Sequence, residues 1–106
     1  LSISKILDEI KILVGQRFFV RKDINFDISR RKEINKNIMD IEAQEIHDFD
    51  LSYSSDIDGI KYVYNDGSWV LVRISGTENV VRIYCESAQE EITDFIIDKV
   101  IKLITI

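Results

Sequence analysis

Apolar runs separated by short polar stretches in the second half of the chain predict three consecutive β-strands. Aromatic and β-branched residues dominate residues 60–64, 69–74 and 80–86, which is typical of strands. Residues 65–68 read Asn-Asp-Gly-Ser, a strong turn signal, and the five polar residues of 75–79 have the length of a hairpin loop. The pattern therefore predicts an antiparallel meander at the centre of the fold.

Apolar residues recur at helical spacing in three other segments. Residues 2–14 have an amphipathic helical pattern, and a second helix is expected over residues 29–42, with Ser29 as its N-cap. A third helix follows Ser87, which forms a capping-box pattern with Glu90. Helices covering one face of a small antiparallel sheet give an α+β fold.

Two further segments have weaker patterns. Residues 16–26 mix aromatic and charged side chains and are expected to form another strand, which brings the sheet to about four strands. Residues 43–58 are polar and acidic and are predicted to be mostly loop. This loop contains His47, the only histidine. Since no cysteine or second histidine is nearby to complete a metal site, we interpret His47 as an incidental surface residue.

Composition and charge narrow the possible functions. The 106 residues suffice for one domain, and the mix of 45% hydrophobic and 31% charged residues is that of a soluble globular protein. A net charge of −5 argues against a general nucleic-acid binder. No signal peptide or membrane-spanning run is recognisable, so a cytoplasmic protein is expected. The single cysteine, Cys85, is predicted to be a small buried residue in a strand.

The polar loop between the last two predicted strands carries groups suited to an anion. Ser75 and Thr77 offer hydroxyl donors, and Gly76 permits backbone conformations closed to other residues and a close approach to N–H groups. Arg73 and Arg82, on the flanking strands, add positive charge and a fork geometry suited to phosphate oxygens. The sequence therefore predicts a small oxyanion cradle, with phosphate as the expected guest.

The same residues also have interpretations that involve no ligand. Ser-Gly-Thr is an ordinary turn composition, and arginines at hairpin ends are commonly solvated or paired with a carboxylate such as that of Glu78. The basic cluster Arg30–Lys36 in the second predicted helix suggests an anion or nucleic-acid patch. We favour a solvated face for it, paired with the acidic residues Glu33, Asp40 and Glu42.

The stretch 58–87 resembles the C-terminal domain of the α-D-phosphohexomutases, the superfamily of phosphoglucomutase and phosphomannomutase. Residues 73–78 match its Arg-x-Ser-Gly-Thr-Glu loop, and Arg82 matches the arginine of the following strand, whereas Asn79 stands where proline is usual. The resemblance implies a TATA-binding-protein-like α+β fold, with about four strands and helices on one face of the sheet.

The same resemblance implies that residues 1–106 are a single domain, the fourth and last of a longer enzyme. The start at Leu1, without a methionine, also suggests an excised piece. Residues 1–15 are then the helix that leads in from the preceding domain.

By the resemblance, the parent protein is an isomerase that transfers a phosphoryl group within hexose 1-phosphate or hexose 6-phosphate. This domain grips the non-reacting phosphate and closes the cleft. The implied phosphate-binding residues are Arg73, Ser75, Gly76, Thr77 and Arg82, with Glu78 in support.

The phosphoserine and a Mg²⁺ site belong, by the resemblance, to the three preceding domains. This chain is therefore expected to contain no catalytic or metal-binding residue and to be inactive alone. The parent is expected to need Mg²⁺ and a bisphosphorylated hexose activator. The expected partners are the phosphosugar and the preceding domains, not nucleic acid or a membrane. The alternative is a non-catalytic α+β protein-interaction module in which the loop is only a hairpin turn.

Overall fold

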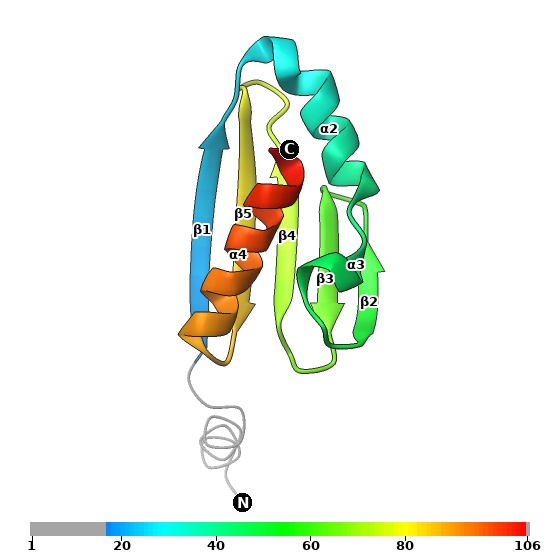
Figure 1. The fold of residues 1–106 in the computed structure, drawn as a ribbon, viewed down its shortest axis with the longest axis vertical. Helices are drawn as coiled ribbons and strands as arrows, with labels where there is room; N and C mark the ends of the chain where they lie inside the picture. Colours follow the sequence, from blue (N-terminus) through cyan, green and yellow to red (C-terminus); the bar gives the residue numbers. More distant parts are fainter. Residues whose placement is uncertain (1–16, 106) are drawn as a thin grey trace, which may run out of the picture.

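In the computed structural model, which describes residues 17–105, the predicted meander lies at the centre of a five-stranded sheet (Figure 1). The strands follow the order β1-β5-β4-β3-β2, and every neighbouring pair is antiparallel. The last strand therefore lies between the first and the fourth. The elements are β1 (Phe18–Asn25), η1 (Ile28–Arg30), α2 (Arg31–Asp40), α3 (Ala43–Ile46), β2 (Leu51–Ser55), β3 (Ile60–Tyr64), β4 (Trp69–Ile74), β5 (Val80–Ser87) and α4 (Glu90–Ile104).

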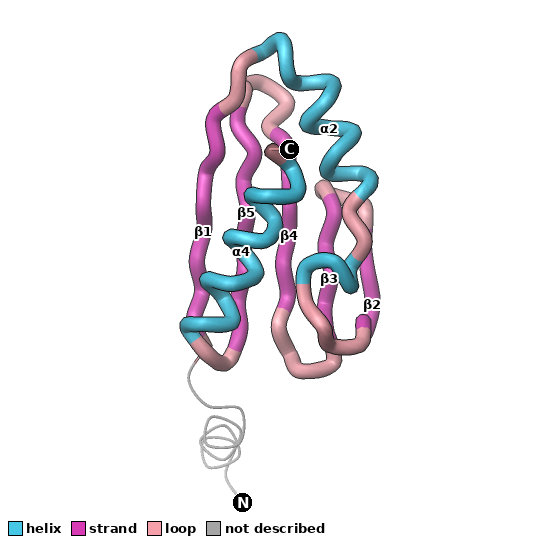
Figure 2. Tube along the Cα trace, viewed as in Figure 1, coloured by secondary structure: helices cyan, strands magenta, loops and turns pink. Residues whose placement is uncertain are grey.

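Helices α2, α3 and α4 all lie on the same face of the sheet (Figure 2). Burial alternates along β4 and β5 accordingly, since successive side chains of a strand point to opposite faces. Val72 and Ile83 are buried toward the helices, whereas Arg73 and Arg82 point to the uncovered face. The core is completed by buried residues of the three helices, namely Ile34, Ile38, Ile46, Ile96, Ile97, Val100 and Ile104. The expected α+β fold is confirmed.

The sheet has five strands, one more than the sequence indicated, because the segment 43–58 is not mostly loop. It contains the short helix α3 and the edge strand β2, which pairs only with β3. All β2 residues except Ser55 are exposed, and a bulge interrupts the pairing between Leu51 and Tyr53. An exposed edge strand has no buried face, so it leaves no apolar alternation for sequence analysis to detect.

Two predicted helix caps are wrong in detail. The Asp27 side chain, not that of Ser29, caps the first helical turn, by accepting a hydrogen bond from the Ser29 N–H at 3.0 Å. At α4, the N-cap is Gln89, without a side-chain cap bond. Ser87 is the last residue of β5 and is buried, and its hydroxyl contacts Thr93 at 2.6 Å. The strand continues one residue further than its pattern indicated, so the serine becomes part of the core.

The helix predicted over residues 2–14, and with it the connecting segment 1–15, lies outside the described residues. In the part of the chain from 17 to 105, no helix is long and apolar enough to cross a membrane. Cys85 is fully buried, as its place in a strand predicted.

Candidate anion-binding site

The strand register brings three charged residues into one row on the uncovered face of the sheet. Arg73 of β4 lies directly opposite Arg82 of β5, and Arg82 in turn lies opposite Asp23 of β1. Directly opposed residues of an antiparallel pair project to the same face, with Cβ atoms only about 5 Å apart. The two arginines singled out from the sequence are thus true neighbours, at the ends of β4 and β5 that lead into the loop 75–79.

The positive charge of this row is only loosely compensated. Arg73 is exposed and has no hydrogen bond or ion pair with any of the described residues. Arg82 has the carboxylates of Asp23 and Glu78 at 3.9 Å each, beyond hydrogen-bond length. The carboxylate of Asp23 instead accepts hydrogen bonds of 3.1 and 2.9 Å from Arg21, which lower its pKa.

Arg82 also carries an unsatisfied donor. Its Nε atom is buried and has no hydrogen-bond partner among residues 17–105. Leaving a buried polar group without a partner typically costs about 1–3 kcal/mol, so such groups are rare in folded proteins. The two guanidinium groups thus combine opposed positive charges with a donor that lacks an acceptor among the described residues.

Ser75 shapes the loop from within. Its backbone N–H donates to the Val80 carbonyl at 2.9 Å, and its Oγ accepts from the N–H groups of Thr77 at 3.3 Å and Glu78 at 3.1 Å. Ser75 is only 6% exposed. The N–H groups of Thr77 and Glu78 are therefore already satisfied by the serine and are not free donors for an anion. The hydroxyl hydrogen of Ser75 takes no part in these bonds and remains available for donation.

Gly76 does not adopt a special backbone conformation. Positive φ among the described glycines occurs at Gly59 and Gly67, and not at Gly76, so that part of the expectation is wrong. The hydrogen bonds from the Thr77 and Glu78 N–H groups to Ser75 Oγ close the turn, so no residue of the loop needs a positive φ. A Cβ atom built on Gly76 meets no heavy atom within 4 Å. The loop is therefore open at this point, and a ligand can approach the backbone closely.

Arg31 is a site residue that the sequence analysis missed. One guanidinium nitrogen donates to the Ser75 carbonyl, and the other donates to the Glu78 carbonyl at 3.2 Å and to Asn79 Oδ1 at 3.5 Å. These contacts connect residues 44 to 48 positions apart, so no local sequence pattern could have predicted them. The solvated-face interpretation is correct for two other members of the basic cluster, since Arg30 pairs with Glu33 and Lys36 pairs with Asp40.

Lys61, another basic residue near the predicted site, does not join the arginine row. It lies opposite Leu71, and its Nζ atom is 5.0 Å from the centre of the Trp69 ring. A cation over an aromatic face is a favourable contact by itself. The structure thus gives Trp69 a packing role on the uncovered face, where its ring also lies 6.1 Å from that of Phe19.

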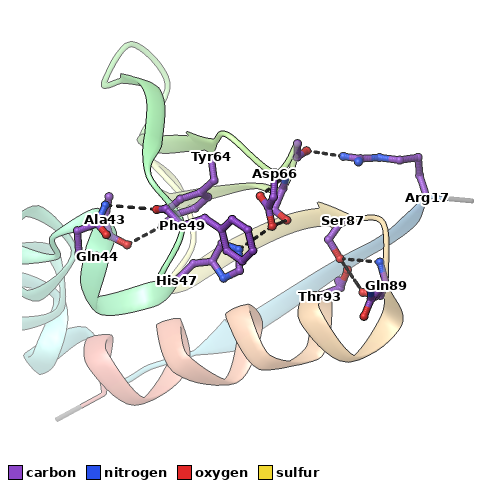
Figure 3. A network of polar contacts seen from close by, with 12 residues as sticks. Arg17, Ala43, Gln44, His47, Phe49, Tyr64, Asp66, Ser87, Gln89 and Thr93 are labelled. Carbon is purple, nitrogen blue, oxygen red and sulfur yellow. Dashed lines mark hydrogen bonds and ion pairs between the residues drawn. The ribbon is translucent and has the colours of Figure 1, made fainter. Parts of the chain in front are cut away.

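His47 belongs to a separate polar cluster at the other end of β4 (Figure 3). It is only 7% exposed, and its Nε2 atom lies 2.8 Å from Oδ2 of Asp66. Its ring stacks on Phe49 and meets the edge of Tyr64. The expectation of an incidental surface residue is wrong, because α3 carries the histidine down onto the sheet. Asp66 also accepts two hydrogen bonds from Ser68, so the cluster stabilises the β3–β4 turn.

Within residues 17–105, no three His, Cys, Asp or Glu side chains lie close enough together to hold a metal ion. The Mg²⁺ that the resemblance implies for a longer parent protein stays a prediction.

Comparison with known proteins gives one family match and several relatives. The family model described as "Phosphoglucomutase/phosphomannomutase, C-terminal domain" matches residues 24–103. The chain is similar to a probable phosphoglucosamine mutase of Methanobrevibacter smithii, with 42% identity over 55 residues, which are 52% of this chain and 12% of the relative.

Two further relatives agree with this match. A probable phosphoglucosamine mutase of Methanothermobacter thermautotrophicus is 49% identical over 57 residues, covering 51% of this chain and 12% of the relative. A phosphoglucomutase/phosphomannomutase of Thermococcus kodakarensis is 56% identical over 34 residues, covering 32% of this chain and 7% of the relative. The chain thus matches no more than 12% of the length of any of these three proteins.

Proposed function

Since this chain belongs to the phosphoglucomutase/phosphomannomutase C-terminal domain family, we propose that it is the domain with which a phosphohexomutase grips a substrate phosphate. In this proposal the longer protein interconverts hexose 1-phosphate and hexose 6-phosphate. The domain holds the phosphate that is not reacting and moves with it to close the cleft.

The observation that carries the proposal is the opposition of Arg73 and Arg82 beside the loop 75–79. Two like charges directly opposed across a ladder disfavour the folded state, and the buried Nε of Arg82 is left without an acceptor among the described residues. A phosphate dianion offsets both costs, because it neutralises the two cations and offers several acceptor oxygens to their guanidinium forks.

Each residue has a distinct role in this proposal. Arg73, exposed at the end of β4, makes the direct bidentate contact, and Arg82 adds charge and its free Nε donor. Ser75 and Thr77 contribute hydroxyl donors. Gly76 leaves the approach to the backbone open.

Holding the remote phosphate contributes to catalysis without any chemical step in this domain. Binding energy from a non-reacting part of the substrate orients the sugar and restricts its motion relative to the reacting groups. In the resembled enzymes, a phosphoserine and Mg²⁺ in the preceding domains supply the phosphoryl-transfer chemistry. This chain is therefore expected to be inactive by itself.

The names of the relatives support one substrate class in this proposal. Two of the three described above are named phosphoglucosamine mutase, which favours an amino-sugar phosphate. Glucose and mannose phosphates are the alternative substrates, and they should be compared with the amino-sugar phosphate in the same assay.

The test is Arg73→Ala in the longer enzyme, assayed with each of the three sugar phosphates. Loss of a charge-assisted contact is worth about 1.5–3 kcal/mol, so kcat/KM is expected to fall roughly 10- to 100-fold, mainly through a higher KM. Lys22→Ala, which removes one exposed charge from β1, is the matched control and is expected to leave the kinetics unchanged. Wild-type KM and kcat in the Arg73 variant would show that the loop does not bind the substrate.

A further inference from the structure

The loop 75–79 is held by the short segment 26–31, which includes the connection from β1 and the first residue of α2. Arg31 spans the loop, since one guanidinium nitrogen contacts the Ser75 carbonyl at its start and the other contacts the Glu78 carbonyl near its end. Phe26 adds a backbone bond, its N–H donating to the Asn79 carbonyl at 3.1 Å. Both ends of the loop are therefore tied to the same short segment.

The guanidinium group is itself held in place. Its carbon lies 6.0 Å from the centre of the Phe26 ring, and the side chain is partly buried. Because the fork of an arginine is planar and rigid, its nitrogens can reach two carbonyls in fixed directions at once. A lysine at the same position keeps the charge and cannot reproduce this two-point contact.

Asn79 completes the contact with its side chain. Its Oδ1 atom lies 3.5 Å from Arg31 Nη1, at the position where the resembled loops usually have proline. A proline stiffens a loop by fixing its own φ angle. Here the loop residue is free of that restraint, and the arginine contact restrains it instead.

We propose that Arg31 is a positioning residue that keeps the loop 75–79 preformed for an anion beside Arg73 and Arg82. This inference rests on the proposed phosphate-binding function of the loop. Arg31 does not touch the ligand, because the structure directs its donors to the loop carbonyls and to Asn79. A site that is already ordered before binding loses less conformational entropy on binding, so its affinity for the ligand is higher.

The first measurement needs no ligand. Amide hydrogen exchange of Thr77 and Glu78, whose N–H groups bond to Ser75 Oγ, is followed by NMR in the 106-residue chain. Arg31→Ala is expected to speed their exchange by about tenfold or more, because the loop then opens more often. Arg31→Lys is expected to resemble it, whereas Lys32→Ala, the exposed neighbouring charge on α2, is expected to match the wild type.

The second measurement is a titration of the same variants with inorganic phosphate. The wild type is expected to show saturable shifts at Ser75 to Glu78, and Arg31→Ala and Arg31→Lys to bind about tenfold more weakly. Asn79→Ala, which removes one contact and keeps the other two, is expected to weaken binding by about threefold. Circular dichroism establishes that each variant is folded before it is compared.

The outcomes separate this inference from the proposed function. If the Arg31 variants exchange and bind like Lys32→Ala, Arg31 does not position the loop, and the phosphate role of Arg73 is unaffected. If the wild-type chain shows no saturable shifts, the loop is not preformed and the inference is wrong. The proposed function is decided independently, by the kinetics of Arg73→Ala in the longer enzyme.

Discussion

Arg73 and Arg82 face each other directly across the β4–β5 ladder. Among the described residues, Arg73 has no ion pair, and the nearest carboxylate oxygens to Arg82, those of Asp23 and Glu78, are 3.9 Å away. Opposed like charges of this kind destabilise a sheet by roughly 0.2–1 kcal/mol. Under the proposed function, a bound anion would offset this cost by neutralising the two charges.

This arrangement predicts that Arg73→Ala separates stability from ligand response. Because Arg73 is exposed and unpaired within residues 17–105, its loss removes only the repulsion with Arg82 and is expected to raise the free energy of unfolding by no more than about 1 kcal/mol. Phosphate is expected to raise the unfolding midpoint of the wild type and of Lys22→Ala, through preferential binding to the folded state, but not that of Arg73→Ala. Urea denaturation with and without phosphate measures both quantities. A large loss of stability without phosphate would contradict this account of Arg73.

Substitution by alanine is predicted to destabilise the protein at Gly59 and to have little effect on its stability at Gly76. At Gly76 the added methyl group meets no atom within 4 Å and φ is not positive, so stability is expected to change by less than about 1 kcal/mol. At Gly59, with φ of +103°, the methyl lies 2.4 Å from the Val72 carbonyl oxygen, and a loss of about 2 kcal/mol or more is expected. Thermal unfolding of the two variants provides the comparison. Equal destabilisation would show that the loop around Gly76 is closed.

The pair of His47 and Asp66 is predicted to stabilise the protein and to weaken in acid. His47→Ala removes a buried ring and leaves Asp66 short of a partner, which is expected to cost about 2–3 kcal/mol in urea denaturation. Burial by itself raises the pKa of Asp66, but hydrogen bonds from His47 and Ser68 outweigh it, and the pKa is lower than usual.

The sign of the pH dependence follows from that lowered pKa. The folded protein binds the Asp66 proton more weakly than the unfolded chain does. This contribution to stability is therefore fully present above the unfolded pKa of about 3.9, and it is lost as pH falls through the lower folded pKa. Asp66→Asn is expected to reduce the loss of stability between pH 5 and acid pH of about 2–3. An unchanged acid profile would mean that the carboxylate of Asp66 does not contribute.

Cys85 is predicted to be unreactive in the folded protein. Burial raises the pKa of its thiol to about 12, and the side chain has no exposed surface. Because the thiolate is the reactive form, a thiol reagent at neutral pH is expected to label Cys85 only when the protein unfolds. Labelling rates measured across a urea series test this, and they should follow the fraction unfolded. Rapid labelling without urea would show that β5 opens locally.

The meander was predictable from the sequence because its signals are local. β3, β4 and β5 are short runs rich in aromatic and β-branched residues, and the Asn-Asp-Gly-Ser turn precedes β4 directly along the chain. The motif at residues 73–78 also indicated the family correctly. These features depend only on residues a few positions apart, for which periodicity and turn composition are reliable guides.

What the sequence left undecided depends on which segments meet in space. β2 has almost no buried residue to mark it as a strand, and His47 becomes buried only because α3 places it beside Asp66. In the sequence, Arg31 is one of several charges in a basic run. Its role becomes visible only in the fold, which places the start of α2 against the loop. By itself, then, the sequence determined the central strands, the arginines and the family. Only the tertiary structure decided that the arginines oppose each other and that a third one supports the loop, since contacts across more than forty residues leave no periodic trace.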